Sequence, residues 1–255
     1  MIRNLFAAAL LAALCAGLVT AAIQHFRVTP LILHAETFEG EGGHSHGEQA
    51  VVADHEHAEG TPEHSHDAVA ATVAEPEEWA PQDGFERTAY TTLATVLAAA
   101  GFALVIGAVS MFANIPITFA SGFLWGMAGF LTFSLAPAYG LAPELPGMPA
   151  ADLVARQLWW VGTALATGGA ILLLAKTRAN WAFAVAVALV FAPHIIGAPA
   201  APDEASAVPA HLATEFAAIT LGTSFVFWLL LGSLFGKFSD VFATRSAALP
   251  NGAHA

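Results

Sequence analysis

Apolar residues run along most of this chain in blocks about as long as a bilayer is thick, and short polar segments separate the blocks. A helix that crosses a hydrocarbon core of about 30 Å needs roughly 20 apolar residues, and its backbone groups must bond to one another. Six blocks fit this description without any Asp, Glu, Lys or Arg, at residues 5–23, 89–112, 117–135, 158–175, 181–196 and 216–235. The pattern predicts an all-α, polytopic helical membrane protein with about six transmembrane helices.

Two of these blocks are atypical as transmembrane spans, so a protein with five spans is the alternative. The fifth is short, and Pro193 interrupts it near its end. The first resembles a cleaved signal, because Arg3 precedes an apolar stretch and Thr20 begins a run of small residues. The stretch is nevertheless as long as a full span, so we favour six retained helices.

The longest polar segment, residues 38–86, contains Pro62, Pro76 and Pro81 and almost no large apolar residue. It lacks the apolar surface to build a core, which predicts a long disordered outer loop. The chain therefore divides into a first transmembrane helix (1–24), an external His/Asp/Glu-rich metal-capture loop (25–88), a five-helix transmembrane core (89–236) and a cytoplasmic C-terminal tail (237–255).

Composition and charge narrow the function. Of the 255 residues only 11% are charged, against roughly 25% in soluble domains, and the mean hydropathy is +0.63. With eight basic residues and a net charge of −12, the chain lacks the basic surface that nucleic acids require. No phosphate-binding loop or zinc-protease helix motif occurs, so we expect no enzyme and no permanently bound cofactor.

The basic residues predict an orientation, because cytoplasmic loops carry the excess of Lys and Arg. With the N- and C-termini in the cytoplasm, five basic residues lie inside and three outside. Asp240 is then the only acidic residue inside, and the other nineteen face out. The outer surface is thus predicted to be anionic and to attract cations.

Three His-x-His pairs stand in the predicted loop among Asp and Glu residues: His44 and His46, His55 and His57, and His64 and His66. Side chains at positions i and i+2 of an extended chain point to the same side, so each pair presents two imidazoles to one ion. Imidazole is largely neutral near pH 7 and, with carboxylates, suits divalent cobalt, nickel, zinc or copper. We interpret the six histidines as mobile metal-capture ligands; the alternative is a merely solvated acidic loop.

Polar residues at the outer span ends form a possible translocation vestibule: His34, Glu36, Glu144, His194, His211 and Glu215. Interfacial packing or helix capping is the alternative explanation for each of them taken singly. Two small-residue motifs, Gly122-x-x-x-Gly126 with Gly129 and Gly232-x-x-x-Gly236, predict close helix packing rather than chemistry.

Four segments in this order resemble the CbtA family of predicted cobalt transporter subunits: 28–36 (VTPLILHAE), 143–147 (PELPG), 156–160 (RQLWW) and 193–199 (PHIIGAP). The resemblance implies a multi-pass importer in the bacterial inner membrane that serves cobalamin biosynthesis. It also implies a small single-span partner, CbtB, with metal-binding histidines of its own, and about five spans.

The combined hypothesis is a membrane transporter subunit that imports a divalent transition metal, most specifically Co²⁺, through a periplasmic His-rich loop. A nickel or zinc permease shares every feature named above, because the order of metal affinities does not favour cobalt at such ligands. A membrane metal sensor or metallochaperone platform that does not transport needs the loop but no pathway. The sequence leaves the oligomeric state open.

Overall fold

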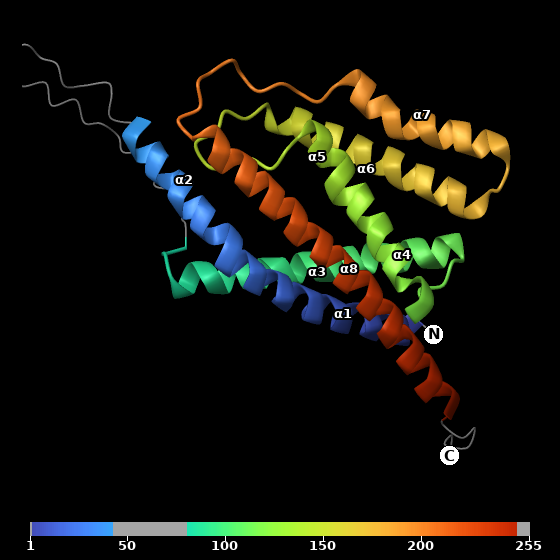
Figure 1. Cartoon of the computed structure of the whole chain (residues 1–255). Coiled ribbons are helices and arrows are strands. Elements are labelled where there is room, and N and C mark those ends of the chain that lie inside the picture. The colour runs from blue at the N-terminus through green and yellow to red at the C-terminus, as the bar shows by residue number, and fades with distance from the viewer. Residues whose placement is uncertain (1, 43–80, 249–255) are drawn as a thin grey trace, which may run out of the picture.

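The computed structural model describes residues 2–42 and 81–248, and within these ranges every regular element is a helix (Figure 1). The elements are α1 (Ile2–Ile23), the π-helical turn η1 (Gln24–Val28), α2 (Thr29–Gly42), α3 (Phe85–Ala113), α4 (Phe119–Phe130), the π-helical turn η2 (Leu131–Leu135), α5 (Ala136–Gly140), α6 (Leu153–Lys176), α7 (Asn180–Ile196) and α8 (Ala210–Ala248). The predicted all-α fold class is confirmed. The six histidines of the predicted capture loop lie outside the described residues.

Five helical stretches in the described ranges are long and apolar enough to cross a membrane: Ile2–Phe38, Phe85–Ala113, Phe119–Gly140, Leu153–Lys176 and Ala210–Arg245. The fifth predicted span is α7, an apolar helix of 17 residues that ends before Gly197, whose φ is 90°. α7 lies antiparallel to α6 at one side of the bundle (Figure 1). The protein is therefore a multi-pass membrane protein with five to six spanning helices.

The first helix continues beyond its predicted end. Residues 25–42, assigned to the loop in the sequence analysis, extend the helix through η1 and α2. Pro30 has no N–H to bond to the carbonyl one turn earlier, which would normally kink or end a helix. Here η1 comes directly before it, and the Thr29 N–H bonds to the Gln24 carbonyl five residues back. The wider π turn accommodates the missing N–H and the ring of Pro30, so the helix continues past it.

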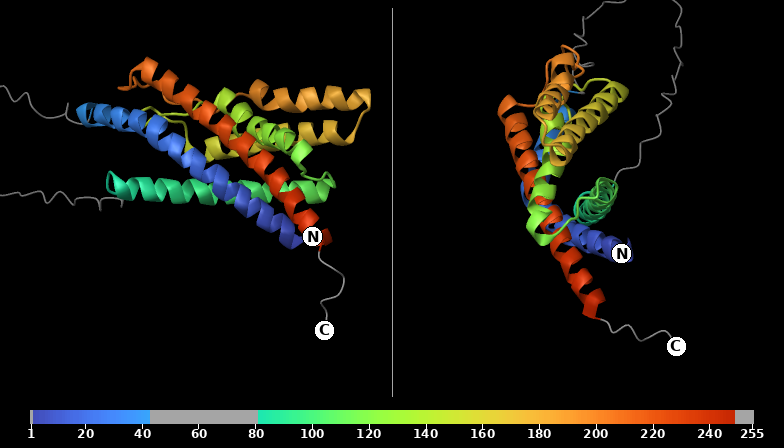
Figure 2. Two further views of the ribbon diagram at one scale, coloured as in Figure 1. Left: turned by 60° about the horizontal axis from the view of Figure 1, so that its bottom comes forward. Right: turned by 90° about the vertical axis from the view of Figure 1, so that its right-hand side faces the viewer.

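The core forms where α1 packs against α3 and α8, and where α8 packs against α4 (Figure 2). α1 contributes a face of fully buried alanines, and small side chains are what allows membrane helices to approach closely. These residues are Ala8, Ala9, Ala12, Ala13 and Ala16. Trp228, Leu231 and Phe235 of α8 fill the space between the helices.

The two glycine motifs meet at the crossing of α4 and α8. A Cβ atom on Gly122 would stand 2.5 Å from the Gly232 carbonyl oxygen, and one on Gly126 would stand 3.2 Å from the Leu229 Cα. The backbones approach this closely because neither helix has a side chain at the contact. The predicted packing role of both motifs is confirmed.

Contacts between distant segments define the two ends of the bundle. At the end that holds both described chain termini, the Phe119 N–H donates to Asp240 at 2.9 Å and Lys176 Nζ donates to the Ala113 carbonyl at 2.6 Å. At the other end, called here the α2 end, Ala35 of α2 packs in a cluster with Leu145 of a connecting loop and with α8. The regions flanking the undescribed residues 43–80 both lie at the α2 end (Figure 2).

Candidate functional site

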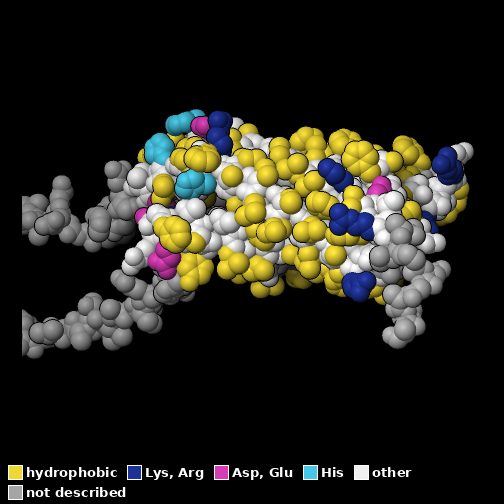
Figure 3. Space-filling view, turned by 90° about the horizontal axis from the view of Figure 1, so that it is seen from below, with side chains coloured by type: hydrophobic (Ala, Val, Ile, Leu, Met, Phe, Trp, Pro, Cys, Tyr) yellow, Lys and Arg dark blue, Asp and Glu magenta, His cyan; other side chains and the backbone are white. Residues whose placement is uncertain are grey.

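Charged and imidazole side chains gather at the ends of the bundle, and hydrophobic side chains cover its middle. Figure 3 shows histidines at one end of the face in view and most Lys and Arg side chains at the other. A belt of exposed apolar side chains is the surface expected to contact lipid, because hydrocarbon offers no partner to polar groups. The charged and imidazole side chains that could bind a ligand therefore lie at the two ends.

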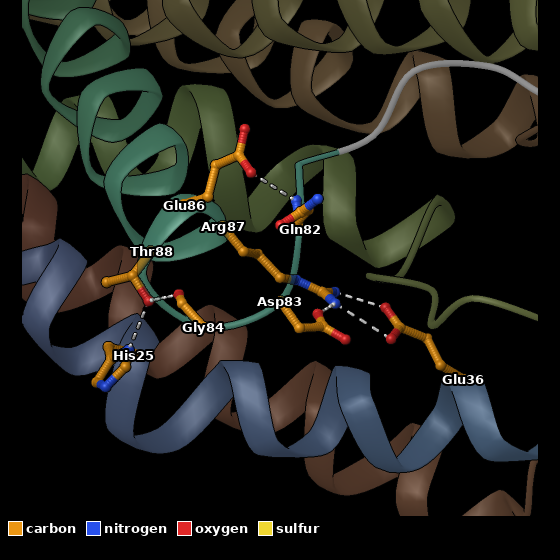
Figure 4. A network of polar contacts seen from close by, with 8 residues as sticks. All are labelled: His25, Glu36, Gln82, Asp83, Gly84, Glu86, Arg87 and Thr88. Atoms are coloured by element: carbon orange, nitrogen blue, oxygen red, sulfur yellow. Dashed lines mark hydrogen bonds and ion pairs between the residues drawn. The ribbon is translucent and has the colours of Figure 1, made fainter.

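An ion-pair network joins α2 to the start of α3 (Figure 4). The Arg87 guanidinium donates to both carboxylate oxygens of Glu36, at 2.5 and 3.2 Å, and to Asp83 at 2.9 Å. This two-pronged geometry is the one that Arg and a carboxylate form best. Beside it, Thr88 Oγ1 lies 3.4 Å from His25 Nδ1. Since α2 and α3 flank residues 43–80, the Glu36–Arg87 pair links the two helices on either side of the His-rich segment.

The second predicted acid of the vestibule is also paired. Glu144 lies 2.8 Å from Arg156 of α6, and both side chains line a cavity of about 730 Å³ between α5, α6 and α8. We call this the wide cavity. Gln157 and Ser134 add polar groups to its wall. Leu145, next to Glu144, packs on α2, so the wide cavity belongs to the α2 end of the bundle.

The predicted histidines of the vestibule occupy different places. His34 is exposed on α2, and His211 and Glu215 are exposed on the first turns of α8. His194, near the end of α7, packs edge-on against the rings of Tyr139 and Trp159, with centroids 5.2 and 5.8 Å away. His194 Nδ1 is buried and, among the described residues, has no hydrogen-bond partner.

No three His, Cys, Asp or Glu residues stand close enough to hold one metal ion within residues 2–42 and 81–248. The six vestibule residues are distributed around the α2 end rather than converged on a point. Two of them, Glu36 and Glu144, are neutralised by arginines. The vestibule therefore stays a prediction, and its described part has no preformed coordination site.

The sequence analysis missed a second cavity, of about 200 Å³, between α1, α3 and α8. We call this the narrow cavity, and its polar wall consists of Thr20, Gln24, Thr95, Thr220, Thr223 and Ser224. Hydroxyl and amide groups inside apolar spans do not lower the hydropathy enough to interrupt a span. The available signal was the recurrence of Thr and Ser at helical spacing in residues 220–224.

The comparison with family models decides the class of protein. A model described as probable cobalt transporter subunit (CbtA) matches residues 2–240. The chain belongs to the CbtA family. The match extends from the first helix into α8 and so includes both cavities and the Glu36–Arg87 pair. Comparisons with curated proteins and with solved structures find no match.

Membership confirms the resemblance inferred from the four segments. It makes the chain a member of a family described as probable cobalt transporter subunits. One of the four segments, 156–160, supplies Arg156, and another, 28–36, supplies Glu36. A third segment, 143–147, supplies Glu144, so three of the segments that carry the resemblance provide charges that pair at the α2 end.

Proposed function

We propose that this protein is the membrane subunit through which Co²⁺ enters a bacterial cell for cobalamin synthesis. The α2 end faces the periplasm and both termini face the cytoplasm, in the bacterial inner membrane. The excess of Lys and Arg at the opposite end supports this orientation. Cobalt is the cargo, and the protein holds no permanently bound cofactor.

The observation that carries this proposal is the family match together with the ion pair that links the two helices flanking the His-rich segment. The ion pair between Arg87 Nη2 and Glu36 Oε1, 2.5 Å apart, ties α2 to the start of α3 on the two sides of that segment, and α2 packs on Leu145, next to Glu144 of the wide cavity. Ions that bind weakly to His44, His46, His55, His57, His64 and His66 are thereby released close to the cavity mouth. Several weak sites favour transfer over storage, because each ion must leave as readily as it binds.

A nickel or zinc permease uses the same ligands, and competition measurements distinguish it from a cobalt importer. A metal sensor or metallochaperone platform that does not transport needs no route through the helices. The two cavities along α8 favour the transporter. Because the family consists of probable transporter subunits, we propose that the chain works with a partner, a small single-span CbtB-like protein beside the lipid-facing helices.

The test is uptake of radiolabelled Co²⁺ into proteoliposomes that hold the purified chain, with and without the small partner. Excess Ni²⁺ and Zn²⁺ serve as competitors. We expect time-dependent uptake that both competitors inhibit only weakly. Strong inhibition by one of them would identify that metal as the cargo. Metal binding without uptake under every energised condition, with or without the partner, would refute the transporter and support the sensor.

Replacing the six loop histidines with asparagine tests the capture step. Asparagine keeps a polar side chain but removes the imidazole nitrogen, so we expect the KM for Co²⁺ to rise several-fold and the maximal rate to stay the same. His254→Asn, in the C-terminal tail, is the matched control. An unchanged KM would refute the capture role of the loop.

A further inference from the structure

A groove of about 270 Å³ lies between α3, α4 and α6, away from the residues of the predicted vestibule. The groove exists because α3 packs mainly on α1 and makes no extensive contact with α4 or α6. Among the described residues, no charged side chain lines it, and Ser121 and Thr132 supply its only hydroxyl groups. We call this the apolar groove. Its wall includes Val109, Ile115, Trp125, Gly168 and Leu172.

Water finds few partners in the apolar groove. Ser121 Oγ already donates to the Pro116 carbonyl at 3.0 Å and accepts the Thr118 N–H at 3.0 Å. A space with apolar walls stays dry or takes up an apolar molecule, and an empty space forfeits dispersion contacts of its lining. The groove therefore suits a hydrocarbon occupant.

The volume of the apolar groove fits a lipid chain better than a helix. A helix about 10 Å across fills about 400 Å³ for every turn of about 5.4 Å, so the groove holds less than one turn. A methylene group takes up about as much space as a water molecule, about 30 Å³, so the groove has room for about nine methylene groups. These form a large part of one acyl chain.

One end of the apolar groove lies at the end of the bundle that holds both described chain termini. Ile115, in the connection from α3 to α4, and Ala175, in the last turn of α6, line the groove there. Lys176 follows Ala175, and its Nζ donates to the Ala113 carbonyl at 2.6 Å, which bridges α6 to α3. An ammonium group has three N–H donors, so two of them stay available for a ligand.

Positive charge gathers at this end of the bundle. Arg178 lies two residues after Lys176, and both side chains are exposed. Neither pairs with a carboxylate within residues 2–42 and 81–248. The Asp240 carboxylate, at the same end, already accepts the Phe119 N–H at 2.9 Å. Figure 3 shows most Lys and Arg side chains of the face in view at this end. The groove thus combines an apolar wall with two cations at one end.

We propose that the apolar groove binds one anionic phospholipid, with an acyl chain between α3, α4 and α6 and the phosphate beside Lys176 and Arg178. Basic sites between transmembrane helices bind anionic head groups in this way. A free phosphate ion makes no use of the apolar wall. The bound lipid fills the space that separates α3 from α4 and α6 and so holds α3 in position. This inference goes beyond the proposed function and does not depend on it.

Quenching of tryptophan fluorescence by brominated lipids tests the site, because Trp125 is the one tryptophan among the described residues that line the groove. The full chain is placed in phosphatidylcholine vesicles that contain a rising fraction of phosphatidylglycerol with brominated acyl chains. A parallel series uses brominated phosphatidylcholine. The difference between the wild-type chain and Trp125→Phe gives the signal of Trp125. We expect brominated phosphatidylglycerol to quench this signal at a several-fold lower mole fraction than brominated phosphatidylcholine.

Substitutions of the two cations test the head-group contact. Lys176→Gln and Arg178→Gln should each raise the mole fraction of phosphatidylglycerol that gives half-maximal quenching by about fivefold, because each basic residue near a membrane surface contributes about that factor. Lys176→Arg keeps the charge and should quench like the wild-type chain. Lys237→Gln with Arg245→Gln is the matched control, because both residues are exposed at the same end but belong to α8, which does not line the groove.

Three outcomes would overturn the inference. Equal quenching of Trp125 by the two brominated lipids would show that the groove holds lipid without selecting the head group. No quenching by either lipid would show that another occupant, such as a helix of a second copy, fills the groove. An equal loss of preference in the Lys237→Gln, Arg245→Gln control would assign the preference to the overall charge of this end. These measurements contain no Co²⁺, so failure here leaves the proposed function intact.

Discussion

Gly232→Ala, at the crossing of α8 and α4, tests whether the position of α8 is set by backbone contact. A Cβ atom on Gly232 would stand 2.7 Å from the Gly126 Cα, and the Gly122 carbonyl oxygen and the Gly126 nitrogen would be closer still. All three are backbone atoms and cannot rotate away. The helices must therefore separate by about 1 Å for all three atoms to reach an ordinary contact of 3.4 Å, and this separation removes a quarter to a half of the dispersion energy of the displaced pairs.

Overpacking of this kind costs about 1–3 kcal/mol, and rigid backbone neighbours place Gly232→Ala near the upper value. Replacing a helical glycine with alanine returns about 1 kcal/mol through helix propensity. We expect a net loss of about 2 kcal/mol in the free energy of unfolding. Gly222→Ala is the matched control, because it lies on the same helix and its Cβ would meet no atom within 4 Å.

Reversible unfolding in mixed detergent micelles, followed by tryptophan fluorescence, measures this loss. Trp228 reports on the crossing, because its ring contacts Gly129 and it packs against Phe133. Gly122→Ala added to Gly232→Ala should cost less than the sum of the two single changes, since one separation of the helices relieves both clashes. Wild-type stability of Gly232→Ala, or strict additivity of the pair, would refute the close-contact explanation.

Two further predictions concern the α2 end. Arg87→Glu should raise the KM for Co²⁺ by placing like charges at the ends of the His-rich segment, yet lower stability by only about 1 kcal/mol, because both partners are partly exposed, at 26% and 34%. Adding Glu36→Arg should restore the KM, and failure of this swap would contradict the clamp. His194→Ala should lower the uptake rate even at saturating Co²⁺. His194→Phe keeps the ring contacts with Tyr139 and Trp159, so normal uptake by this variant would show that the imidazole nitrogens have no role.

The sequence by itself determined the membrane class and the helical fold. Hydropathy is a local property, since each span must satisfy its own backbone hydrogen bonds, and each predicted span coincides with a helix, although the first and last helices are longer than predicted. The spacing of glycines in the two small-residue motifs also predicted close helix packing from the sequence alone. The sequence also showed the ambiguity between five and six spans, because the apolar block at residues 181–196 is short and forms a helix of only 17 residues, α7.

Only the tertiary structure decided which groups meet. The sequence around Glu36 does not predict its ion pair with Arg87, fifty-one positions later, because the pairing depends on how α2 lies against α3. The continuation of the helix past Pro30 likewise depends on a π turn that local rules do not predict. The narrow cavity is the clearest case. Thr20 and Thr220 are ordinary residues in their own apolar helices, and they line one cavity only because α1 and α8 pack against each other.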